Sequence, residues 1–152
     1  MNVIANFTLA ASLMALSFTA HAAQANPAEQ VIKYGNVEIH YNAMPTDELQ
    51  PAVAKNYHIE RSHNRGLLTI AVLRKNKLGV SEPVPAKLTA TVVNLNSQLA
   101  EIDMREVKEG GAVYYLGEFR ITPPDTLKFS VTAKPTGETR EYKAEFNRPF
   151  FQ

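Results

Sequence analysis

The chain has 152 residues, enough for one domain, and its 45% hydrophobic and 20% charged residues are typical of a globular protein rather than a disordered one. Its net charge of +1, with no block of one sign, argues against binding of nucleic acid through a basic face. The absence of cysteine excludes disulfides, thiolate metal sites, iron–sulfur clusters and a thiol nucleophile.

The first segment has the pattern of an export signal. Phe7–Ala20 is a run without charge, and Ala20-His21-Ala22 gives the small-x-small sequence that signal peptidases accept, although no Lys or Arg precedes the run. We expect a signal peptide over residues 1–22, a loose leader over 23–33 and a soluble periplasmic protein with no membrane span after cleavage. An uncleaved anchor is the alternative, but the run is shorter than the roughly 20 residues that cross a bilayer core.

Period-two alternation of apolar and polar residues recurs along the rest of the chain and predicts half-buried strands. In chain order we expect strands at residues 37–42, 67–73, 87–95, 99–108, 113–121, 127–134 and 142–146. The strand at 67–73 is apolar on both faces, which indicates a central strand that is covered on both sides.

Turn and helix signals lie between these strands. Glu109-Gly110-Gly111 and Pro135-Thr136-Gly137-Glu138 contain the residues that tight hairpins need. Pro51–Tyr57 has proline at a suitable first position and good helix formers after it, so we expect a helix of at most two turns there.

These elements predict an all-β domain over residues 34–152. We expect an antiparallel β-sandwich of immunoglobulin-like type, with about seven strands plus one short helix. A closed barrel is the alternative. The sequence has no Trp and no Cys pair, so the domain is not of the antibody type.

Three histidines follow the signal, His40, His58 and His63. A metal site needs three or four convergent ligands, and His58-x-Glu60 with His63 is not a standard spacing. We therefore predict solvated histidines, with no metal, no cofactor and no catalytic residue.

The densest polar cluster is Arg61-Ser62-His63-Asn64-Arg65-Gly66. Two guanidiniums can offer paired donors to a carboxylate of a partner, whereas the other interpretation is a solvated loop that enters the next strand. We place a possible interaction surface at Arg61, Asn64 and Arg65, with Glu118 and Arg120 behind them. The partner would be a periplasmic protein or peptide, which an exposed sheet edge could also bind as an added strand.

Acidic residues gather around the Gly110-Gly111 hairpin, namely Glu106, Glu109 and Glu118. Paired carboxylates in a cleft can perform acid–base chemistry, but on a solvated face they form ordinary cross-strand charge pairs. An enzyme that uses them with His63 is therefore an alternative to a non-catalytic binding module.

Two adjacent aromatic residues, Phe150 and Phe151, precede the final Gln152. They would either cap the core or form an exposed hydrophobic tail. An exposed tail would favour a third function, that of a chaperone-like or structural envelope protein.

Three groups of short stretches are distinctive together: Tyr34-Gly35 with His40-Tyr41-Asn42-Ala43, Arg61-Ser62-His63-Asn64-Arg65, and Arg105-Glu106-Val107-Lys108-Glu109-Gly110 with Tyr114-Tyr115-Leu116-Gly117-Glu118-Phe119-Arg120. They resemble a family of small exported proteins of gammaproteobacteria, catalogued as domain of unknown function 4426. The resemblance covers Tyr34 to Phe146 and implies a periplasmic, all-β protein. It implies no activity, so ligand, partner, oligomeric state and pathway stay open.

Overall fold

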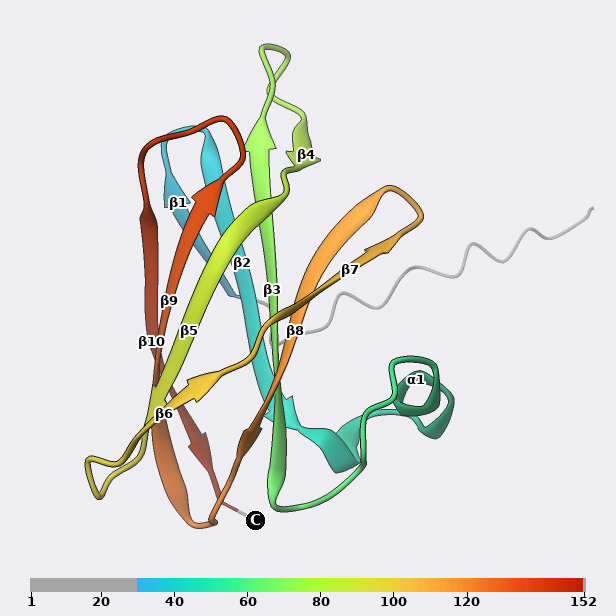
Figure 1. Cartoon of the computed structure of the whole chain (residues 1–152), viewed down its shortest axis with the longest axis vertical. Helices are drawn as coiled ribbons and strands as arrows, with labels where there is room; N and C mark the ends of the chain where they lie inside the picture. The colour runs from blue at the N-terminus through green and yellow to red at the C-terminus, as the bar shows by residue number, and fades with distance from the viewer. Residues whose placement is uncertain (1–29, 152) are drawn as a thin grey trace, which may run out of the picture.

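In a computed structural model that describes residues 30–151, the chain folds into two antiparallel sheets packed face to face (Figure 1). The strands of this described part are β1 (Gln30–Tyr34), β2 (Val37–Pro45), β3 (Arg65–Lys75), β4 (Ser81–Pro83), β5 (Ala86–Val93), β6 (Leu99–Ile102), β7 (Arg105–Glu109), β8 (Ala112–Arg120), β9 (Asp125–Pro135) and β10 (Tyr142–Phe150). A 3-10 turn, η1 (Thr46–Glu48), and one helix, α1 (Pro51–Asn56), lie between β2 and β3. The expected signal peptide lies outside the described residues.

The first sheet has the order β1-β2-β3-β8-β7, with β4 also paired to β3, and the second has the order β10-β9-β5-β6. The predicted antiparallel β-sandwich is therefore confirmed. The described residues form ten strands rather than about seven, because β1 and β4 were not predicted and the strand predicted at 99–108 is two strands, β6 and β7. Over the same residues, no helix is long and apolar enough to cross a bilayer.

Two boundaries predicted from the sequence are wrong. Residues 30–33, which we assigned to the leader, belong to β1 and pair with β2. Residues 99–108 are not one strand, because β6 pairs with β5 in the second sheet whereas β7 pairs with β8 in the first. The chain crosses between the sheets against Gly117, where an added Cβ would lie 2.4 Å from Sδ of Met104.

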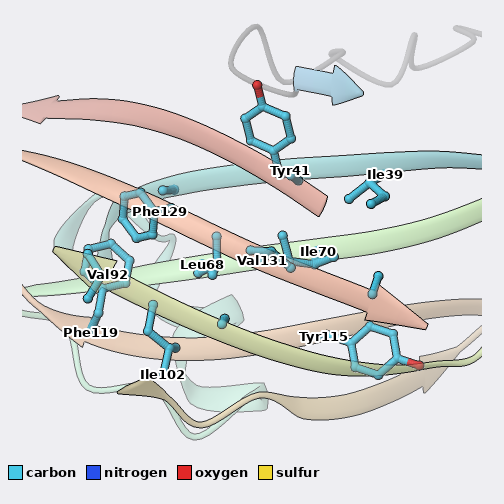
Figure 2. Close-up of a cluster of buried hydrophobic side chains, with 14 of the residues drawn as sticks. Ile39, Tyr41, Leu68, Ile70, Val92, Ile102, Tyr115, Phe119, Phe129 and Val131 are labelled. Carbon is cyan, nitrogen blue, oxygen red and sulfur yellow. The ribbon is translucent and has the colours of Figure 1, made fainter. Parts of the chain in front are cut away.

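The core lies between the two sheets and is rich in aromatic rings (Figure 2). Phe129 is fully buried, meets Phe119 edge-on at 4.9 Å between ring centroids and stacks on Phe146 at the same distance. Phe150 is 4% exposed and also meets Phe119, whereas Phe151 is 77% exposed. Of the two terminal rings, one therefore caps the core and the other faces solvent.

Candidate functional site

The outer face of the first sheet, the face turned away from the second sheet, carries a second apolar cluster. Successive side chains of a strand point to opposite faces, so Leu67, Thr69 and Ala71 of β3 face outward while Leu68 and Ile70 enter the core. Leu67 and Leu116 pack with Ala54 and Ile59 of the segment that connects β2 to β3. This segment, residues 46–64, therefore covers one end of the outer face.

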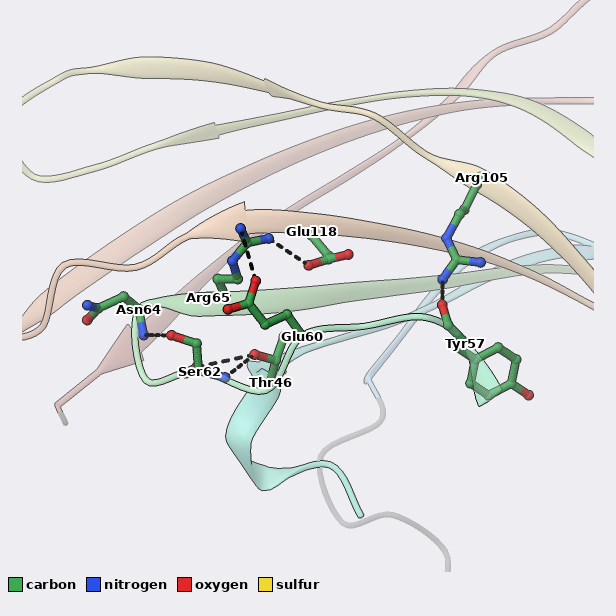
Figure 3. Close-up of polar contacts among 8 residues, drawn as sticks. All are labelled: Thr46, Tyr57, Glu60, Ser62, Asn64, Arg65, Arg105 and Glu118. Atoms are coloured by element: carbon green, nitrogen blue, oxygen red, sulfur yellow. Dashed lines mark hydrogen bonds and ion pairs between the residues drawn. The ribbon is translucent and has the colours of Figure 1, made fainter. Parts of the chain in front are cut away.

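The two ends of the covering segment are fastened to each other. Thr46 is fully buried, and its hydroxyl accepts a hydrogen bond from the Ser62 amide (2.9 Å) and donates one to the Ser62 carbonyl (3.2 Å; Figure 3). These two hydrogen bonds hold the ends of the covering segment together on either side of α1.

Helix α1 is also fastened to the edge strand β7. The Tyr57 phenol donates a hydrogen bond to the Glu109 carboxylate. The Arg105 guanidinium donates one to the Tyr57 carbonyl (Figure 3). The bond to Glu109, together with burial, raises the pKa of Tyr57, so the phenol stays protonated and remains a donor. The covering segment, which forms a roof over the outer face, is therefore bound to β7 at the edge of the sheet.

Between this roof and the sheet lies a pocket of ≈ 320 Å³. Its lining is predominantly apolar, with a few polar groups, and comes from β2, β3, β7, β8 and the covering segment. The lining residues are His40, Tyr41, Asn42, Met44, Leu49, Val53, Tyr57, Ile59, Leu67, Thr69, Ala71, Val107, Tyr114 and Leu116. Both the volume and the composition fall in the range that is usual for small-molecule sites.

The floor of the pocket is low because two small side chains occupy the middle of β3. Thr69 lies between Asn42 of β2 and Leu116 of β8 in the strand register. Ala71 pairs with His40 of β2, whose side chain is larger than that of Ala71. A second hollow of ≈ 280 Å³ shares Ala71, His40 and Tyr114 with the pocket and extends to β4. The outer face is thus hollowed along β3.

A charged cluster stands beyond the far end of this hollowed strip. Glu38 is 6% exposed, and its carboxylate lies 3.1 Å from the Lys75 ammonium and 3.8 Å from that of Lys33. The same carboxylate accepts a hydrogen bond from Ser81 (3.3 Å) and lies 3.5 Å from Nε2 of His40. The hydrogen bond from Lys75 holds the pKa of Glu38 below its ordinary value, in spite of burial.

The predicted interaction surface lies near the opposite end of β3. Arg65 forms ion pairs with Glu118 (3.2 Å) and Glu60 (3.5 Å), and Arg120 is its register partner on β8 (Figure 3). Arg61 donates to the carbonyl of Asp47, and the Asn64 amide donates to the Ser62 hydroxyl. The structure brings Arg65, Glu118 and Arg120 together, and their role as an interaction surface stays a prediction.

The acidic residues considered for catalysis have separate partners. Glu106 stands opposite Tyr115 in the register and accepts a hydrogen bond from the Tyr115 phenol (2.9 Å). Nδ1 of His63 lies 2.5 Å from Oδ2 of Asp47. Within residues 30–151, no three His, Cys, Asp or Glu side chains converge as a metal site would require.

Sequence reasoning missed the pocket. The available signal was the pair Thr69 and Ala71, two small side chains in a strand of Leu, Ile and Val. We interpreted the strand as covered on both faces. The cover is partial, because α1 is short and leaves the strip over Ala71 open.

Comparison with known proteins identifies the family. The family model for a domain of unknown function, DUF4426, matches residues 31–152. The chain belongs to the DUF4426 family. A crystal structure of a DUF4426 family protein from Pseudomonas aeruginosa is similar, with 31% sequence identity and a TM-score of 0.69 over 82% of this chain and 95% of that one.

Two structures of FetP from uropathogenic E. coli share the fold of this DUF4426 domain. Each is 10% identical with a TM-score of 0.58, and they cover 82% and 81% of this chain and 94% and 95% of their own. One was expressed recombinantly in the periplasm, and the other is a copper-bound variant. At this identity the likeness shows the fold alone. No curated protein matches the sequence significantly.

Proposed function

We propose that this DUF4426 domain is a non-catalytic binding protein of the periplasm, and that its site is the pocket between α1 and the outer face of the first sheet. The observation that carries the proposal is the concave, mostly apolar hollow of ≈ 320 Å³ with a few polar groups in its wall. A ligand with apolar surface gains roughly 25 cal/mol for each Å² that it buries in such a site.

The arrangement of the lining favours a ligand site over imperfect packing. Leu67 and Leu116 fill the closed end against Ala54 and Ile59. Thr69 and Ala71 leave the adjacent floor low, although β3 carries large apolar side chains at Leu67 and at Leu73. The covering segment is held at both ends by hydrogen bonds, so the hollow is part of a well-fastened structure.

The periplasmic location rests on the export signal in the sequence and on the similarity to FetP, which was expressed in the periplasm. Copper, which is bound in the FetP variant, is not part of the proposal. The pocket lining offers few copper ligands. His40 is the one imidazole in the described lining, and its Nε2 already faces the Glu38 carboxylate at 3.5 Å.

The other two functions gain less from the structure. The carboxylates and His63 considered for an enzyme have separate partners and are not among the residues that line the pocket beneath α1. An exposed Phe151 is the observation that favours a chaperone-like role, but the ring beside it, Phe150, belongs to the core.

The test is a titration of the mature protein with N-phenylnaphthylamine, a neutral probe whose fluorescence rises in apolar surroundings. Thr69→Phe fills the floor of the pocket and is expected to abolish the rise. Thr132→Phe is the matched control, because Thr132 occupies an outward position on the second sheet's central strand β9 and lines none of the described pockets. Thr69→Leu repeats the test with a smaller side chain if Thr69→Phe does not fold. Equal fluorescence in all four proteins would overturn the proposal.

A further inference from the structure

The two hollows over β3 form one elongated trough. Both hollows are lined by Ala71 of β3, with His40 of β2 on one side of it and Tyr114 of β8 on the other. From Leu67, beneath the covering segment, to Leu73, beside β4, the trough follows six residue steps, which is about 20 Å at a strand rise of roughly 3.3 Å per residue. Helix α1 and β4 lie toward opposite ends of β3 (Figure 1). An elongated hollow of this length suits an extended, unbranched chain.

The end of the trough beside β4 is positively charged. Lys75 lies two residues beyond Leu73 and therefore on the same face of β3. Lys75 and Lys33 share one carboxylate, that of Glu38, so the cluster holds two ammonium groups against one buried anion. The Lys33 and Lys75 side chains are 65% and 40% exposed, and each ammonium has three donors, so both can bind a further acceptor.

Among residues 30–151, the other carboxylates near this end have partners other than the two lysines. Glu82 of β4 stands opposite Arg74 in the register and accepts a hydrogen bond from Asn76. Glu138 pairs with Arg74. The lysine end therefore keeps an excess of positive charge.

The end of the trough beneath α1 has the opposite character. It is closed by the apolar side chains of Leu67, Leu116 and Ile59, and the nearby carboxylates of Glu118 and Glu60 are both paired with Arg65. An anionic group placed there would meet apolar side chains, and the nearby guanidinium already has two carboxylate partners. A ligand with one charged end would therefore place its chain beneath α1 and its anionic group beside β4.

We propose that the ligand is a free, single-chain anionic amphiphile of the fatty-acid type, whose chain lies along β3 over Thr69 and Ala71 and whose carboxylate meets Lys33 and Lys75. This inference rests on the proposed function, because it assigns the class of ligand to the same pocket. Charge-assisted hydrogen bonds from the two ammonium groups would fix the direction in which the chain enters.

The experiment compares calorimetric titrations of the mature protein with palmitate and with palmityl alcohol, both below the concentrations at which they aggregate. Palmitate is expected to bind on the order of tenfold more tightly than the alcohol, because only the acid carries the charge. The double variant Lys33→Gln/Lys75→Gln should lower palmitate affinity to that of the alcohol and leave the alcohol unchanged. The matched control is Lys87→Gln/Lys134→Gln, a pair of exposed lysines that face each other on the second sheet.

A second variant tests the course of the chain. Ala112→Leu partly fills the second hollow, which Ala112 lines, and Ala112 is not part of the lining of the pocket beneath α1, so the change should weaken both long-chain ligands and spare N-phenylnaphthylamine. Equal affinity of acid and alcohol, or no effect of the lysine substitutions, would overturn the anionic class. Absence of binding by both long-chain compounds, with the neutral probe still bound in a Thr69-dependent way, would overturn this inference and leave the proposed function standing.

Discussion

The phenol of Tyr57 donates a hydrogen bond to the carboxylate of Glu109, a residue 52 positions further along the chain. The contact joins the end of α1 to β7, the edge strand of the first sheet. Because the pocket lies between α1 and the sheet, this bond and the neighbouring bond from Arg105 to the Tyr57 carbonyl hold the roof of the pocket against its floor.

Tyr57→Phe removes the bond to Glu109 and keeps the ring. We expect a loss of about 1 kcal/mol, the usual net contribution of one hydrogen bond, confined mostly to the covering segment. The amide of Ile59, which donates to the Ala54 carbonyl at 2.8 Å, reports on this segment by hydrogen exchange. Its exchange should accelerate while that of core amides such as Phe129 does not. Unchanged exchange at Ile59 would show that the bond does not hold the roof.

Gly66 is required by the position of the Phe119 ring. A Cβ at residue 66 would lie 2.1 Å from Cζ of Phe119, inside any real contact distance. Gly66→Ala should therefore cost about 1–3 kcal/mol of unfolding free energy through overpacking. Phe119→Leu should offset part of that cost in the double variant, as measured by urea denaturation of all four proteins. Strict additivity of the two changes would mean that the ring and residue 66 do not compete for space.

Glu38 should make stability depend on pH. Its pKa is lowered in the folded protein, chiefly by the hydrogen bond from Lys75, from an ordinary value of 4.5. A carboxyl group with a depressed folded pKa stabilises the fold above its unfolded pKa and loses that contribution as pH falls through the folded pKa. Glu38→Gln should therefore destabilise the protein at neutral pH and flatten the decline below pH 4.5. Glu141→Gln, at an exposed site, should leave the wild-type curve unchanged.

The two terminal aromatic rings should differ sharply in their effect on stability. Phe150→Ala removes a ring that is 4% exposed and should cost about 3–5 kcal/mol. Phe151→Ala removes a ring that is 77% exposed and should stay within about 0.5 kcal/mol of the wild type. Thermal unfolding of the two variants gives the comparison, and similar melting temperatures would contradict the placement of Phe150 in the core.

The alternation of side chains predicted most of the fold, because burial on one face leaves a period of two in the sequence. Leu127, Phe129 and Val131 are buried as that pattern predicts. The break at Asp103 and Met104 was not predictable, since alternation continues through it and only the tertiary structure assigns β6 and β7 to different sheets.

The candidate site depends on relations that a sequence does not display. Thr69 and Ala71 are unremarkable as strand residues, and their small size matters only because taller side chains flank them on neighbouring strands. The contacts of Arg65 show the same limit, because the sequence analysis placed Arg65 and Glu118 in one surface but did not predict that Arg65 forms ion pairs with Glu118 and Glu60.

Binding in the pocket is the central claim, and methyl nuclear magnetic resonance tests it most directly. The mature protein, labelled at Leu and Val methyl groups, would be titrated with N-phenylnaphthylamine, whose aromatic rings shift nearby resonances. We predict the largest shifts at the apolar lining of the pocket, namely Leu49, Val53, Leu67, Val107 and Leu116. Shifts confined to the exposed side chains Leu78, Leu95 and Leu99, or no shifts at any methyl group, would contradict the account.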